Sequence, residues 1–105
     1  MKAALYKEFG PPGVLRYEDV EDPISGPQEI IVQVYAVTVN RVLDCAVRAG
    51  KQPQRGVALP HIGGVDPAGV VIDVGVGVSN VRTGDRVALL SRVPCLGCKC
   101  CQAGD

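Results

Sequence analysis

Short runs of alternating apolar and polar residues dominate this chain, and they predict a mainly β fold. The clearest run spans residues 29–39, where Ile30, Val32, Val34 and Ala36 share one face of an extended chain. Further strands are predicted at residues 3–6, 14–20, 70–74 and 86–90. Glycine- and proline-rich turns separate them. Such a chain should close into a small, partly open barrel or a folded sheet.

After residue 39 the period changes to that of a helix, which predicts one short helix. Asn40 is suited to cap its start, and Gly50 is suited to end it. Asp44 and Arg48 are four residues apart and are expected on the outer side. Cys45 is expected to be a small buried hydrophobe. The apolar helical face consists of Val42, Leu43, Ala46 and Val47.

Length and charge limit the classes of function. A chain of 105 residues forms one domain at most, and an apolar content of 47% is typical of a folded one. The formal net charge is zero and there is no basic block, which argues against nucleic acid or an anionic membrane as partners. No apolar run reaches membrane-spanning length. The N-terminus becomes charged too early for a signal peptide.

Four of the five cysteines lie close together near residue 100. Cys95, Cys98 and Cys101 have the spacing C-x₂-C-x₂-C, which returns three thiolates to one point. A structural zinc takes four ligands, so the adjacent Cys100 is the substitute at hand for the fourth. This crowding favours metal in a reducing compartment, hence the cytoplasm, over a disulfide framework. Cysteines without metal remain the alternative.

One glycine-rich segment imitates a nucleotide-binding loop. Residues 75–80 (GVGVSN) follow a predicted strand, as in a dinucleotide fingerprint. The fingerprint needs a third small residue and then a helix, but position 80 is Asn80 and the following residues break any helix. A turn between strands is therefore predicted, and no nucleotide-binding βαβ unit.

An ordered set of landmarks runs along the chain. They are residues 1–4 (MKAA), 13–20 (GVLRYEDV), 63–71 (GGVDPAGVV), 74–78 (VGVGV) and 84–87 (GDRV), followed by the cysteine run. This set resembles the medium-chain dehydrogenase/reductase family, which contains the zinc alcohol dehydrogenases and their quinone oxidoreductase relatives. The resemblance implies a GroES-like β domain over residues 1–105 that carries catalytic residues, with residues 91–105 as a truncated structural-zinc lobe. It also implies a separate NAD(P)-binding Rossmann domain, of which no part is expected within this chain.

Within this resemblance the catalytic zinc is expected to be absent. Zinc members place Cys, a variable residue, Ser or Thr, and Asp at the start of the helix, where this chain has Asn40, Arg41, Val42 and Leu43. The family's Gly-His-Glu corresponds to residues 64–66 (GVD), so the His ligand is also replaced. The quinone reductase branch usually has Asp three residues after the Asn, whereas Asp44 is four residues after Asn40.

Four residues near this site keep two interpretations each. Asn40 either orients substrate and nicotinamide by hydrogen bonds or only caps the helix. Arg41 either contacts the cofactor pyrophosphate or is a solvated surface residue. Asp66 is a weak catalytic candidate, and a turn role before the next proline is the alternative. His61 is either a general acid or a satisfied loop residue.

Three functions follow. The first is the catalytic-domain part of an NAD(P)-dependent oxidoreductase that acts on a small carbonyl, enone, quinone or alcohol without catalytic zinc. By the resemblance, Cys95, Cys98 and Cys101 would hold structural zinc, and the isolated chain would not turn over. The second is a stand-alone β module for binding, with homo-oligomers formed through an exposed apolar edge. The third is a zinc-storing or redox-sensing thiol module.

Overall fold

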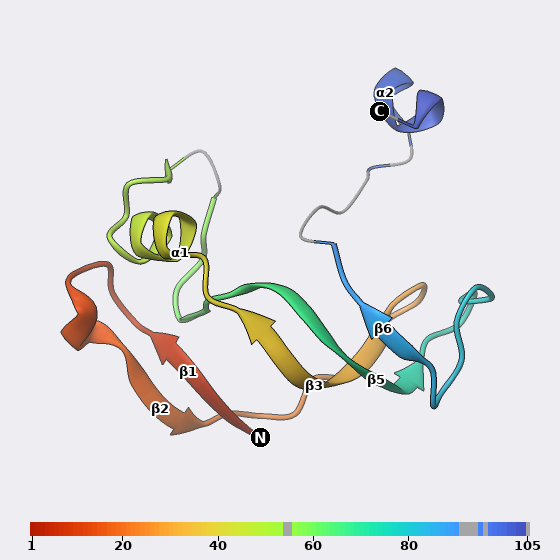
Figure 1. Cartoon of the computed structure of the whole chain (residues 1–105), viewed down its shortest axis with the longest axis horizontal. Helices are drawn as coiled ribbons and strands as arrows, with labels where there is room; N and C mark the ends of the chain where they lie inside the picture. Colours follow the sequence, from red (N-terminus) through yellow and green to blue (C-terminus); the bar gives the residue numbers. More distant parts are fainter. Residues whose placement is uncertain (54–55, 91–94, 96, 105) are drawn as a thin grey trace.

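Two small antiparallel sheets form the body of the molecule. The computed structural model describes residues 1–53, 56–90, 95 and 97–104. The strand orders are β2-β1-β4 and β3-β5-β6. Figure 1 shows the two sheets side by side, with α1 next to the first sheet and α2 set apart from both. The elements are β1 (Lys2–Tyr6), η1 (Pro12–Val14), β2 (Arg16–Asp19), β3 (Ile30–Thr38), α1 (Arg41–Arg48), β4 (His61–Ile62), β5 (Val65–Val74), β6 (Arg86–Ala88) and α2 (Lys99–Ala103).

The prediction of a mainly β fold is confirmed. The structure differs from the prediction in that, within the described residues, both sheets stay open and do not close into a barrel. The predicted second strand is shorter, because residues 12–14 form a 3₁₀ turn before Arg16. β5 begins at Val65, five residues earlier than predicted, and β4 and α2 were not predicted. β4 has only two residues and exists through its pairing with β1, so local periodicity carries no signal for it.

The β3–β5 ribbon is bent by irregularities in its register. Shifts occur at three places along the pair, including the point between Val37 and Thr38. Such shifts increase the local twist and turn a strand away from a flat sheet. At Gly69 the two backbones lie so close that an added Cβ would stand 2.0 Å from the carbonyl oxygen of Gln33. A glycine is therefore required at position 69.

The turn predicted at residues 75–80 is confirmed. The amide of Val78 donates to the carbonyl of Gly75 at 3.3 Å, and the amide of Gln28 donates to the carbonyl of Val76 at 2.8 Å. The described segment that follows leads into β6 without a helix. All strand pairs of the described residues are antiparallel. The glycines of this segment therefore serve a β turn, as the sequence predicted.

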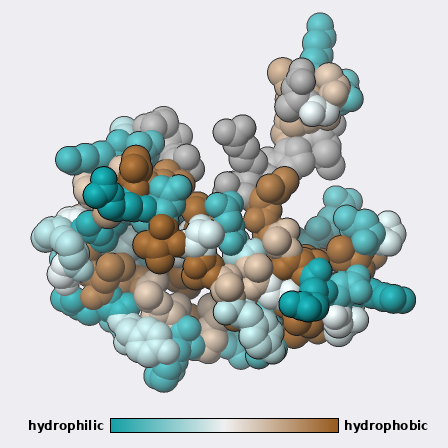
Figure 2. Space-filling model, in the orientation of Figure 1, coloured by the Kyte–Doolittle hydropathy of each residue, from teal (hydrophilic) through white to brown (hydrophobic). Residues whose placement is uncertain are grey.

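The core is small for a chain of this length. Among the described residues, the buried apolar side chains are Ala3, Leu5, Tyr6 and Val71. The accessible surface is 8166 Å², whereas a globular protein of 11.0 kDa exposes about 5,600 Å². The radius of gyration is 15.4 Å, against about 13 Å for a compact domain of this length. Figure 2 shows brown apolar side chains reaching the surface between teal polar ones.

The uncovered apolar residues gather on particular elements. β3 exposes about half of Val34 and of Val37, and Ile72 on β5 is similarly exposed. Val42, on the predicted apolar face of α1, is 76% exposed. Each of these side chains would gain free energy from burial, at about 25 cal/mol per Å² of apolar surface. In the described part of the chain, no helix is both long and apolar enough to cross a membrane.

Candidate functional site

One end of the β3–β5 pair brings the predicted catalytic residues together. Thr38 on β3 is opposite Val65 on β5, and the Thr38 hydroxyl donates to the Val65 carbonyl at 3.1 Å. Asn40 follows Thr38 by two residues, and Asp66 follows Val65 directly. Both therefore lie at the same end of the sheet. We call this place the sheet-end site.

Asn40 is held by hydrogen bonds at both its backbone and its side chain. Its Oδ1 accepts from the amide of Leu43 at 2.9 Å, which is the predicted N-cap of α1. Its backbone amide donates to Oδ2 of Asp44 at 2.8 Å. This reciprocal pattern is that of a capping box, with the acid one residue later than usual. The capping interpretation of Asn40 is confirmed, and no described residue accepts a hydrogen bond from its carboxamide Nδ2, which has two donor hydrogens.

Asp66 stands in an unusual backbone conformation. It is exposed and has φ of +54°, in the left-handed region that Asp tolerates better than most residues. The register places it as the extra residue between the pairs Val37–Pro67 and Thr38–Val65. A bulge of this kind redirects a side chain, and such positions are frequent beside active sites. The sequence suggested a turn role for Asp66, whereas the structure places it inside β5.

Helix α1 supplies the remaining polar groups near the sheet-end site. Arg41 is its first residue and is exposed. Cys45 is exposed rather than buried, so the prediction of a buried hydrophobe was wrong. Arg48 is half-buried and donates from Nη1 to the carbonyl of Gly10. The predicted outer position of Arg48 was therefore wrong as well, because its guanidinium ties α1 to the loop after β1.

A buried tyrosine, Tyr6 at the end of β1, was not predicted from the sequence as part of this region. Tyr6 is 2% exposed, and within the described residues its hydroxyl has no hydrogen-bond partner. His61 is opposite it on β4, with ring centroids 5.4 Å apart and planes tilted by 58°. Loss of solvent raises the pKa of Tyr6; Arg48 opposes this shift, and Asp44 adds to it. His61 thus belongs to a strand rather than a loop, and it packs on a phenol that the local sequence pattern did not single out.

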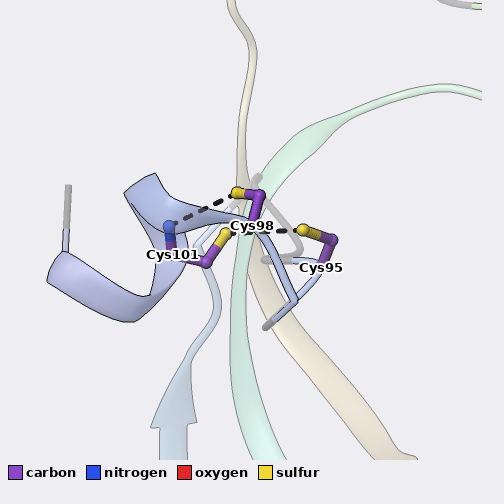
Figure 3. A group of neighbouring side chains, drawn as sticks. All are labelled: Cys95, Cys98 and Cys101. Atoms are coloured by element: carbon purple, nitrogen blue, oxygen red, sulfur yellow. Dashed lines mark hydrogen bonds between the residues drawn. The ribbon is translucent and has the colours of Figure 1, made fainter.

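The three predicted metal ligands meet near α2. The sulfur atoms of Cys95, Cys98 and Cys101 all lie within 4.8 Å of one another, and we call them the thiol cluster. Figure 3 shows the three side chains gathered at the start of α2, with the sulfurs of Cys95 and Cys101 turned toward each other. The sulfurs of Cys95 and Cys101 are 3.7 Å apart, and the sulfur of Cys98 accepts from the amide of Cys101 at 3.4 Å. Cys100 is exposed and is not a member of this group.

The chemistry of the thiol cluster fits a tetrahedral d¹⁰ metal ion. With zinc–sulfur bonds of about 2.3 Å, neighbouring ligands of a tetrahedron are about 3.8 Å apart. The separation of 3.7 Å between Cys95 and Cys101 matches such an edge. The backbone amide of Gly97, and next that of Cys98, lower the pKa of the Cys95 thiol from 9.0 to about 7. Stabilised thiolates are the form that binds metal.

A hollow lies elsewhere, on one face of the β3-β5-β6 sheet. Its volume is about 520 Å³, and its lining is mostly apolar. Asn40, Arg41 and Asp66 do not line it. Hence it is a surface of the open sheet and not part of the sheet-end site. The residues that line it are Tyr35, Ala36, Ala68, Gly69, Val70, Arg86 and Val87.

Comparison with known proteins shows to which family this chain belongs. The model of the alcohol dehydrogenase GroES-like domain matches residues 26–105. The chain belongs to this family. The GroES-like chain is thus part of the medium-chain dehydrogenase/reductase group, as its sequence landmarks predicted.

The chain covers less than a third of the length of the relatives reported next. Quinone oxidoreductase of Rattus norvegicus is 39% identical over 94 residues, which are 89% of this chain and 28% of that protein. A crystal structure of an NAD-dependent alcohol dehydrogenase is 38% identical, with a TM-score of 0.89. The match covers 99% of this chain and 30% of the dehydrogenase. The cobalt- and zinc-bound thermostable alcohol dehydrogenase from Pyrobaculum aerophilum is 36% identical with a TM-score of 0.86, and the two shares are again 99% and 30%. The chain therefore spans about three tenths of the length of each of these relatives.

Proposed function

We propose that the GroES-like chain is the catalytic-domain part of a cytoplasmic NAD(P)-dependent oxidoreductase. It would act on a small carbonyl, enone, quinone or alcohol without a catalytic zinc. The observation that carries the proposal is the sheet-end site. There the fold holds an amide donor at Asn40 and a carboxylate at Asp66, and none of residues 40–43 and 64–66 offers a thiol or imidazole. One carboxylate is a poor zinc ligand set, because catalytic zinc takes three protein ligands.

The proposed mechanism uses Asn40 as a hydrogen-bond donor to the substrate oxygen. Its side-chain carbonyl accepts from the amide of Leu43, so the carboxamide plane is oriented, and no described residue accepts from Nδ2. A donor placed where negative charge develops on a carbonyl oxygen lowers the barrier, and loss of one such donor typically costs a hundredfold or so in rate. Bound NAD(P)H would supply the hydride. Asp66, exposed at its bulge, would accept a hydrogen bond from substrate or water and fix its position.

The resemblance assigns one side chain near this site, that of Arg41, to the cofactor's phosphates. Arg41 is exposed at the start of α1, and a guanidinium binds phosphate oxygens in pairs. The strand pairs of the described residues are all antiparallel, so a parallel βαβ nucleotide site must come from outside them. The large accessible surface and the exposed residues of β3 support a further domain that packs on this one. They argue against the stand-alone module.

In this proposal the thiol cluster has a structural role. Cys95, Cys98 and Cys101 would hold zinc, and the fourth ligand is either Cys100 or a group outside the described residues. Zinc there would fix α2, whose residues are mostly exposed. A reducing compartment would keep these thiols available for metal.

The test is a hydride-transfer assay on the complete protein that contains this chain. Oxidation of NADH and of NADPH is followed by absorbance with benzoquinone, an alkenone and an aldehyde as acceptors, before and after treatment with a chelator. We expect activity with at least one acceptor, and retention of that activity after exchangeable metal is removed. Absence of hydride transfer with all acceptors would refute the oxidoreductase. Loss of activity on chelation, with the fold intact by circular dichroism, would refute the zinc-free site.

Asn40 variants separate catalysis from helix capping. Asn40→Asp keeps an oxygen acceptor for the Leu43 amide but has no donor hydrogens at neutral pH. Asn40→Ala removes both. If Asn40 acts as a donor, both variants lose activity, and only Asn40→Ala loses substantial stability. If Asn40 only caps the helix, Asn40→Asp should keep both stability and activity, and only Asn40→Ala should lose them.

A further inference from the structure

Three features of the molecule remain after the proposed function is assigned. The hollow on the β3-β5-β6 sheet is open and apolar, and nothing in the structure identifies an occupant. The Tyr6 hydroxyl is buried among side chains of its own core. The thiol cluster, in contrast, presents reactive groups that are close together and accessible.

We propose that Cys95 and Cys101 are a redox-modification site, at which a two-electron oxidant such as hydrogen peroxide forms a reversible disulfide. Their sulfurs are 3.7 Å apart, and a disulfide bond needs about 2.05 Å, so a movement of less than 2 Å or so joins them. Cys95 is exposed and lies outside α2. The pairing itself requires neither the proposed hydride transfer nor a bound metal.

The third sulfur of the cluster is the less suitable partner. The sulfur of Cys98 accepts from the Cys101 amide and caps the start of α2. A disulfide at Cys98 would have to pull this sulfur from the cap, whereas a bond between Cys95 and Cys101 leaves the cap in place. Cys100 is next to Cys101 on the helix, so its side chain points about 100° away. These relations select Cys95 with Cys101 among the possible pairs.

The oxidation balances with peroxide as the only co-reactant. The sulfur of Cys95, the more exposed of the two, attacks one peroxide oxygen; the O–O bond breaks, and a sulfenic acid and one water result. The sulfur of Cys101 then attacks the sulfenic sulfur; the S–S bond forms, the S–O bond breaks, and a second water leaves. Two thiols lose two electrons and two protons, and one peroxide becomes two waters. A dithiol reductant reverses the change.

Disulfide formation would compete with metal. It removes two of the three clustered sulfurs, and one remaining thiolate cannot hold zinc in a tetrahedral site. The oxidised protein should therefore release zinc, and reduction should restore binding. This competition rests on the proposed structural zinc, whereas the disulfide does not.

The position of Lys99 allows a direct test by peptide mapping. Trypsin cleaves after Arg92 and Lys99, so Cys95 and Cys98 lie in the peptide of residues 93–99, and Cys101 lies in the next peptide. The reduced, chelator-treated complete protein is exposed to an equivalent of peroxide, free thiols are blocked with N-ethylmaleimide, and the peptides are identified by mass. We expect these two peptides to be cross-linked, and the cross-link to disappear after treatment with dithiothreitol.

Matched serine variants identify the sulfurs. We expect the cross-link to be lost in Cys95→Ser and in Cys101→Ser, and retained in Cys98→Ser and in the neighbouring control Cys100→Ser. A bridge inside the peptide of residues 93–99, a cross-link that survives in Cys101→Ser, or oxidation only to sulfinic acid would each overturn the proposal. The wild-type map decides the outcome even if a variant folds poorly.

Zinc release is measured on the same samples with a chromogenic chelator. Loss of bound zinc in step with the cross-link supports competition. If the disulfide forms while the protein never bound zinc, the structural-zinc proposal fails and the modification site stands. If zinc binds and no disulfide forms, the modification site fails and the zinc proposal stands.

Discussion

The backbone amide of Asn40 donates to the carboxylate of Asp44 at 2.8 Å, so the residue that caps α1 is itself held by the helix that it starts. In the second, reciprocal hydrogen bond, the Leu43 amide donates to Asn40 Oδ1 at 2.9 Å. An acid in the first turn also interacts favourably with the positive end of the helix dipole. Asp44 thus holds the N-cap residue of α1 from a position one residue later than the acid of a usual capping box.

We expect Asn40 and Asp44 to contribute to stability by similar amounts. Asn40→Ala removes the cap and should lower the free energy of unfolding of the complete protein by about 1 kcal/mol. Asp44→Ala should cost about as much through its hydrogen bond, whereas Asp44→Asn keeps an acceptor oxygen and should cost less. Urea denaturation measures all three. An Asp44→Ala variant as stable as wild type would show that its hydrogen bond contributes nothing measurable.

Gly69 should be intolerant of the smallest side chain. A Cβ at this position would stand 2.0 Å from the Gln33 carbonyl oxygen on the neighbouring strand, and backbone cannot move aside easily. We expect Gly69→Ala to lower the free energy of unfolding by about 3 kcal/mol. Gly13 is a matched control, because no atom lies within 4 Å of its added Cβ. Thermal denaturation should separate the two variants, and equal midpoints would contradict the close approach.

The hydroxyl of Tyr6 should contribute little to the stability of the fold. The ring packs between Phe9 and His61, but the buried hydroxyl lacks a partner within the described residues. An unsatisfied buried donor destabilises a fold, so Tyr6→Phe should be neutral or more stable by up to about 1 kcal/mol. Tyr6→Ala removes the ring as well and should cost about 3 kcal/mol. A marked loss in Tyr6→Phe would instead reveal a partner, such as a bound water.

The raised pKa of Tyr6 predicts a loss of stability in alkali. Folding favours the neutral phenol, because burial raises its pKa above the ordinary value of 10.0. This contribution is fully present below pH 10 and is lost as the pH rises through the raised pKa. Tyrosinate absorbance should show one phenol titrating late in the folded protein and normally in denaturant. The late phase should be missing in Tyr6→Phe, and its persistence there would assign it to another tyrosine.

Zinc binding should depend on the thiol cluster and not on the adjacent cysteine. Cys98→Ser removes one of the three clustered sulfurs and should abolish tight binding, whereas Cys100→Ser should leave it intact. Competition with a chromogenic chelator measures both affinities. If Cys100→Ser weakens binding as much as Cys98→Ser does, Cys100 is the fourth ligand, as the sequence allowed.

The sequence alone predicted the elements that local chemistry determines. The alternation of Ile30, Val32 and Val34 indicated β3, and the change of period after Asn40 indicated α1 together with its cap. Cysteine spacing indicated the thiol cluster, because ligands with two residues between them can return to one point through local turns. Each of these signals depends on neighbours within a few residues, so no knowledge of the rest of the fold was needed.

Tertiary structure decided what depends on distant partners. β4 exists because His61 and Ile62 pair with β1; this pairing places His61 on Tyr6 and buries the phenol. Asp66 acquires its left-handed conformation because β3 and β5 fall out of register beside it, and no local pattern encodes that offset. The sheets remain open for a similar reason. Apolar periodicity shows that a face can be buried, whereas burial itself requires a surface that reaches it, and the described residues do not provide one for all of β3.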